Sequence, residues 1–205
     1  MKKRVLSAII MILIFVPILL VGGVFFSVFL TILSIGAMYE LIKIREKVKE
    51  FPLLVKMFAY LLVIFFSTLN YNQNVFSYTM DYHVIAFIIF AFLFPLLFTN
   101  KKDDMYNIND ALYMVGSLLF IGLSFNLIIL IRNYDLNYLI YLLLITVVSD
   151  TFAYLTGRYI GEHKLAPKIS PKKTVEGLLG GLFMGTFVAV VYYFTVINSS
   201  ISLVL

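Results

Sequence analysis

An acidic side chain inside an apolar segment is the first feature of this sequence that points to chemistry. Asp150 lies within Tyr138–Thr156, which contains no other charged residue, and an acid in a membrane span costs about 2.5–3.5 kcal/mol on insertion scales. Such a residue usually faces a polar cavity, a partner or an ion, so we expect Asp150 to organise a site; a purely structural hydrogen bond is the alternative. Tyr154 and Arg158 follow at four-residue steps, which places all three on one helix face.

A lysine-rich loop follows this segment. Residues 164–174 contain four lysines, two prolines, one serine and one threonine. Pro167 and Pro171 exclude a regular helix, so the lysines should project from an extended or turning backbone. Lysine is a common phosphate ligand, and the helix that should open at Thr174 adds partial positive charge at its N-terminus. The loop predicts a polyanion site: a nucleotide and a lipid headgroup both stay open, as does a cytoplasmic anchor. Without an aromatic stacking platform, no nucleic acid partner is expected.

The composition places these residues in a membrane protein. Of 205 residues, 62% are hydrophobic and 13% are charged, whereas soluble domains average roughly 45–50% and about 25%. This excludes a soluble globular domain and a disordered chain. The absence of cysteine excludes disulfides, thiolate zinc sites and cysteine nucleophiles. The fold class predicted is all-α and polytopic, with residues 1–205 as a single integral-membrane domain.

About seven transmembrane helices are expected, because a span needs about 20 apolar residues. The uncharged stretch Val5–Tyr39 is long enough for two, and Gly22-Gly23 is the natural break. The predicted spans lie near Val5–Val21, Val24–Ile42, Leu53–Leu69, Val84–Phe98, Ala111–Ile131, Tyr138–Thr156 and Gly177–Ile197. The basic start resembles a signal peptide but lacks a cleavage site, so an uncleaved first helix is expected.

The basic residues predict the orientation. In a seven-span arrangement 15 of the 16 lysines and arginines fall on one side, and only Arg132 falls on the other. Positive residues concentrate in cytoplasmic loops. We therefore expect the N-terminus and loop 158–176 to face the cytoplasm, in the cell (inner) membrane.

Glycines recur in the last predicted span. Gly177, Gly181 and Gly185 are spaced by four residues, with Gly180 beside them. Small residues at this spacing let another helix approach closely. Helix packing is the interpretation we favour.

The segment from Asp150 to Gly181 resembles the bacterial phosphatidate cytidylyltransferases, or CDP-diacylglycerol synthases. Residues 161–177 read GEHKLAPKISPKKTVEG and are followed by Gly180-Gly181, a long and specific match. The basic start, two linked spans and Glu40 near the end of the second span are similar too. The family is polytopic and transfers a cytidylyl group from CTP to phosphatidate, giving CDP-diacylglycerol and pyrophosphate with Mg²⁺.

The resemblance implies CTP, phosphatidate and membrane lipid as partners and Mg²⁺ as cofactor; a homo-oligomer stays open. Asp150 would orient a lysine or hold the metal ion. The residues assigned to catalysis are Asp150, Lys173 and Glu176. Those assigned to substrate binding are Arg158, His163, Lys164, Lys168, Ser170, Lys172 and Thr174.

One departure from the family pattern is plain. Its signature of a Lys-Asp pair, a Pro-Gly-His-Gly-Gly run and an Asp-Arg pair with a final aspartate, whose carboxylates are associated with the metal ions, is absent here. We therefore expect a truncated chain that is inactive alone. The rival functions are a CTP-dependent polyprenol or phytol kinase, a transporter that uses Asp150 as an ion site, and a non-catalytic remnant.

Overall fold

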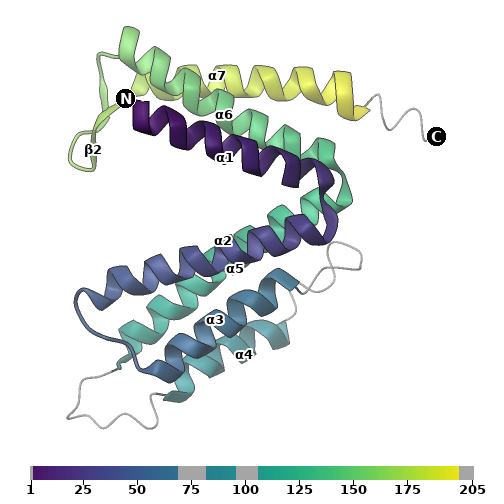
Figure 1. Ribbon diagram of the computed structural model, residues 1–205. Helices are drawn as coiled ribbons and strands as arrows, with labels where there is room; N and C mark the ends of the chain where they lie inside the picture. The colour runs from purple at the N-terminus through teal and green to yellow at the C-terminus, as the bar shows by residue number, and fades with distance from the viewer. Residues whose placement is uncertain (1, 69–81, 96–105, 199–205) are drawn as a thin grey trace. The chain divides into compact units, whose positions relative to one another are not determined.

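The computed structural model describes residues 2–68, 82–95 and 106–198, and this part of the chain is built almost entirely from helices (Figure 1). The helices are α1 (Lys2–Val21), α2 (Gly23–Glu46), α3 (Leu53–Thr68), α4 (Tyr82–Leu93), α5 (Ile108–Tyr134), α6 (Leu136–Tyr159) and α7 (Val175–Tyr192). A short π-helix, η2 (Tyr193–Ile197), continues α7. Each predicted span overlaps a different one of the seven α-helices in the described part of the chain. The all-α prediction is therefore confirmed.

Four of the described helices are long and apolar enough to cross a membrane: α2, α5, α6, and α7 together with η2. By contrast α4 has 12 residues, or about 18 Å at 1.5 Å per residue, against a hydrocarbon core of about 30 Å. The chain is a multi-pass membrane protein. Lys101, Lys102 and nearly all of the loop predicted between the third and fourth spans lie outside the described residues.

The predicted break between the first two spans is confirmed. Helix α1 ends at Val21, and Gly22 and Gly23 have φ angles of 67° and 56°. This left-handed region is strained for residues that carry a Cβ atom. Arg132 occupies the space where a Gly22 side chain would lie, and it donates hydrogen bonds to the carbonyl oxygens of Leu19 (2.6 Å) and Leu20 (2.8 Å). The single basic residue on the predicted outer side thus caps the C-terminal end of α1.

The described residues fall into two compact units, Met1–Tyr134 and Asp135–Leu205. In the first unit α2, α3 and α5 pack against one another, and α4 packs on α3 and α5. Its core is formed by large buried side chains, among them Met38, Ile42, Phe66, Ile88, Phe92, Met114 and Leu118. Asn126 is also fully buried, and its amide donates to the carbonyl oxygen of Phe66 at 2.6 Å.

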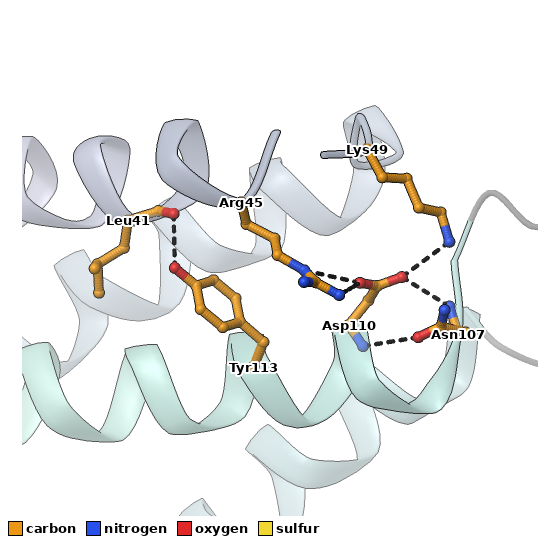
Figure 2. Close-up of polar contacts among 6 residues, drawn as sticks. All are labelled: Leu41, Arg45, Lys49, Asn107, Asp110 and Tyr113. Atoms are coloured by element: carbon orange, nitrogen blue, oxygen red, sulfur yellow. Dashed lines mark hydrogen bonds and ion pairs between the residues drawn. The ribbon is translucent and has the colours of Figure 1, made fainter. Parts of the chain in front are cut away.

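Polar contacts join the ends of α2 and α5 in this unit (Figure 2). The Asp110 side chain is 1% exposed and lies 2.9 Å from Arg45 Nη2 and 3.0 Å from Lys49 Nζ. Asp110 also accepts a hydrogen bond from the backbone N–H of Asn107. One turn further along α5, Tyr113 donates to the carbonyl oxygen of Leu41 at 2.8 Å. Arg45 and Lys49, two of the basic residues from which the membrane orientation was predicted, therefore also hold the end of α2 against α5.

Tyr106 precedes α5 and closes the same end of the core. Its hydroxyl donates to the carbonyl oxygen of Phe92 at 3.0 Å. Burial raises the pKa of Tyr106, and the negative charge of Asp110 raises it further. The phenol therefore stays a neutral hydrogen-bond donor at physiological pH.

The second unit is a helical pair with a small hairpin. Helices α6 and α7 run side by side, and strands β1 (Lys164–Ala166) and β2 (Ser170–Thr174) connect them at one end (Figure 1). Asp135 caps α6, since its carboxylate accepts the N–H of Asn137. The strands are antiparallel, with Lys164 opposite Thr174 and Ala166 opposite Ser170. The extended backbone predicted from the two prolines is confirmed.

Candidate functional site

The first wall of the site is one face of α6. Asp150, Tyr154 and Arg158 line a common pocket, as their four-residue spacing predicts. The Arg158 guanidinium donates to the Tyr154 hydroxyl at 3.2 Å rather than pairing with Asp150. The carboxylate of Asp150 has no hydrogen-bond or ion-pair partner among the described residues, so it is free to meet a ligand.

The second wall comes from the close approach of α7 to α6. Gly177, Gly181 and Gly185 are all buried. A Cβ atom at Gly177 would lie 2.7 Å from the Ala153 carbonyl oxygen, and one at Gly181 would lie 2.7 Å from that of Ser149. Only glycine lets the two backbones come this near. The packing role predicted for the glycines is confirmed.

The β1–β2 hairpin supplies the third wall. Ser170, Lys172 and Lys173 of β2 line the pocket, and Leu165 of β1 adds an apolar contact surface. Thr174 ends β2 and caps α7, because its hydroxyl oxygen accepts the N–H of Gly177 at 3.2 Å. The lysines thus stand directly before a capped helix N-terminus.

The pocket enclosed by these walls has a volume of about 560 Å³, within the range of small-ligand sites. Its lining residues are Asp150, Ala153, Tyr154, Gly157, Arg158, Leu165, Ser170, Lys172, Lys173, Thr174, Gly177 and Leu178. They include three cations and one acid, so the lining carries a formal charge of +2. Three hydroxyl groups, those of Tyr154, Ser170 and Thr174, belong to the same lining. This chemistry suits a phosphate-bearing ligand.

Six of the predicted site residues therefore meet in one place: Asp150, Arg158, Ser170, Lys172, Lys173 and Thr174. Lys164 and Lys168 are exposed on the hairpin and are not part of this lining. Contact between these two lysines and a substrate stays a prediction.

His163 and Glu176 lie beside the pocket and contact each other. His163 Nδ1 is 2.6 Å from Glu176 Oε1. The same carboxylate accepts the backbone N–H groups of Glu162 (3.1 Å) and His163 (3.2 Å). Direct contact of either side chain with a substrate stays a prediction too.

The pocket could hold a metal ion only if substrate phosphates supply most of the ligands. No group of three or more His, Cys, Asp or Glu side chains that could hold a metal is found within the described ranges. Mg²⁺, however, is often held by one or two carboxylates together with substrate phosphates. Asp150 is the one unpartnered carboxylate of the lining, and it meets that smaller requirement.

Comparisons with known proteins give the family. The cytidylyltransferase family model matches residues 2–205. A phosphatidate cytidylyltransferase of Staphylococcus haemolyticus is 33% identical over 96% of this chain and 73% of its own length. One of Staphylococcus aureus is 32% identical over 100% of this chain and 77% of its own length. No solved structure matches the chain significantly. The chain belongs to the cytidylyltransferase family.

The sequence indicated the small-residue face of α7, but the matching face of α6 was not predicted. Ser149, Ala153, Gly157 and Gly161 also recur every four residues, and they form the surface that receives the α7 glycines and Thr174. A Cβ atom on Gly157 would lie 2.8 Å from the Thr174 hydroxyl oxygen. The four-residue spacing of small residues that indicated the stripe on α7 was therefore present on α6 as well.

Proposed function

We propose that this protein is a phosphatidate cytidylyltransferase, which transfers the cytidylyl group of CTP to phosphatidate and releases pyrophosphate. The single observation that carries the proposal is the pocket, whose lining combines the cations of Arg158, Lys172 and Lys173 with the unpartnered carboxylate of Asp150. The Staphylococcus relatives bear the name of this activity.

The pocket residues fit the reaction. A phosphate oxygen of phosphatidate attacks the α-phosphorus of CTP, the bond from that phosphorus to the α,β-bridging oxygen breaks, and pyrophosphate leaves with the electron pair. Such transfers depend mainly on positioning and charge neutralisation. Lys172 and Arg158 would hold the triphosphate, and Lys173 would neutralise charge on the leaving group. The hydroxyls of Ser170 and Thr174 would add hydrogen bonds.

Asp150 is the residue proposed to hold Mg²⁺. When bound, the ion supplies further neutralisation of phosphate charge. Asp150 lies nine residues before Tyr159, the last residue of α6, or about 14 Å along the axis at 1.5 Å per residue. The acid thus lies deeper along the helix than Arg158.

The proposed orientation brings both substrates to this pocket. In a seven-span arrangement 15 of the 16 lysines and arginines would fall on the side of the N-terminus and of loop 158–176, and a bias of this kind is typical of the cytoplasmic face of the inner membrane. CTP would enter from the cytoplasm, and phosphatidate would enter from the headgroup layer beside the pocket.

The position of the transferred label tests the reaction. The protein, as its gene encodes it, is incubated in phosphatidate-containing micelles with Mg²⁺ and with CTP labelled on either the α- or the γ-phosphate. We expect label in the lipid only from α-labelled CTP, and its loss with Asp150→Asn. Lipid labelled only from γ-labelled CTP would identify a lipid kinase instead. Substrate flux in proteoliposomes without nucleotide turnover would identify a transporter.

A further inference from the structure

The base of the β1–β2 hairpin is fastened to the start of α7 by one carboxylate. Glu176 accepts the backbone N–H groups of Glu162 and His163 and pairs with the His163 ring. The backbone N–H of Val175 also donates to the carbonyl oxygen of His163 at 2.9 Å. Residues 13 positions apart are thus joined by side-chain and main-chain contacts.

The lysines of the pocket lie inside the loop that these contacts close. Lys172 and Lys173 are four and three residues before Glu176. Among the described residues, β1 is the one strand that pairs with theirs, and isolated two-stranded hairpins are marginally stable. The contacts at Glu176 therefore add the restraint that such a hairpin lacks.

The pair contributes little to overall stability. The His163 side chain is 78% exposed and that of Glu176 is 24% exposed, and ion pairs of this kind contribute little to folding. The contacts of the Glu176 side chain with Glu162 and His163 are local to the hairpin base. Breaking them should therefore release the hairpin without unfolding the helices.

We propose that His163 and Glu176 form a positioning brace that holds the β2 lysines over the pocket, and that neither side chain contacts the reacting groups. The inference rests on the proposed function for the identity of the ligand, CTP. It gives a role to His163 and Glu176, two of the four predicted site residues that lie outside the pocket lining, and it makes the brace a determinant of nucleotide affinity.

Steady-state kinetics separate a brace from direct participation. We expect Glu176→Ala to raise KM for CTP about tenfold, which corresponds to the loss of about one charge-assisted phosphate contact. His163→Ala should raise KM by less, because it leaves the two backbone contacts of Glu176 in place. The value of kcat should stay within about twofold. Glu176→Gln keeps an oxygen acceptor for the two N–H groups and should recover part of the loss. Glu162→Ala, an exposed acid in the same turn, is the matched control and should behave as wild type.

The double variant gives the sharper test. Because Glu176→Ala already removes the ring contact that His163→Ala would break, His163→Ala in the Glu176→Ala background should cause no further rise in KM. Effects that multiply in the double variant, or a large fall in kcat with unchanged KM, would overturn the brace and place the side chains at the reaction itself.

Amide hydrogen exchange tests the brace without any activity. In Glu176→Ala we expect faster exchange at residues 162 and 163 and along β2, with α6 and α7 unchanged. Exchange equal to wild type would refute the brace even in an active enzyme. A wild-type protein that forms no CDP-diacylglycerol but shows the expected exchange change would refute the proposed function and leave the brace standing.

Discussion

Replacing Gly181 with alanine adds one methyl group where α7 contacts the backbone of α6. That carbon would lie 2.7 Å from the Ser149 carbonyl oxygen and 2.9 Å from Ala153 Cβ. Neither neighbour is the end of a flexible chain, so the two helices must separate. Overpacking of this kind costs about 1–3 kcal/mol. At about 2–4 °C per kcal/mol for a chain of this length, the melting temperature should fall by about 2–12 °C.

The assay is thermal unfolding of the purified protein in detergent, followed by CTP binding below the melting temperature. Gly116→Ala is the matched control, because nothing lies within 4 Å of a Cβ atom there and alanine favours a helix by up to about 1 kcal/mol. We expect Gly181→Ala to lower both stability and CTP affinity, since Asp150 adjoins the displaced Ser149. Equal stability of the two variants would refute the reasoning from helix contact.

Three further predictions follow from single residues. Asp110→Ala should lower the free energy of unfolding by about 1–3 kcal/mol because it removes the contacts of a buried carboxylate with Arg45 and Lys49. The exposed Glu50→Gln should change it by less than about 0.5 kcal/mol. Chemical denaturation measures both, and equal values would contradict the prediction. This chain contains no cysteine, so single cysteines can be introduced as labelling sites. A cysteine at position 164 should react with a membrane-impermeant reagent only from the cytoplasmic side, and a cysteine at position 134 only from the outside. The reverse pattern would invert the topology. In the protein as its gene encodes it, Asp150→Asn should abolish cytidylyl transfer with expression and melting temperature retained; activity near wild type would give Asp150 a structural role.

Much of the architecture could be predicted because the membrane imposes it. Apolar length set the helices, and Gly22-Gly23 set the first break, since positive φ angles are open mainly to glycine. The prolines of the loop indicated an extended backbone, and the four-residue steps from Asp150 indicated a shared face. These signals are local in the sequence, so they could be read without a structure.

Contacts between distant segments could not be predicted in the same way. Asp110 meets Arg45 across 65 residues, and a single acid at a helix start does not indicate its partner. The pairing of His163 with Glu176 depends on the register of a hairpin whose strands are three and five residues long. A polar side chain that could bind a substrate could equally bind another side chain. Only its position in the structure shows which of these contacts it makes.

CTP binding to variants of the hairpin lysines tests the central claim most directly. The titration compares wild type, Lys172→Ala, Lys173→Ala and the exposed Lys47→Ala of the first unit. A charge-assisted contact contributes about 1.5–3 kcal/mol, so the account predicts salt-sensitive binding that weakens about 10- to 100-fold in each hairpin variant and stays unchanged in Lys47→Ala. Binding that is equal in all four proteins would contradict the claim that this pocket holds the nucleotide.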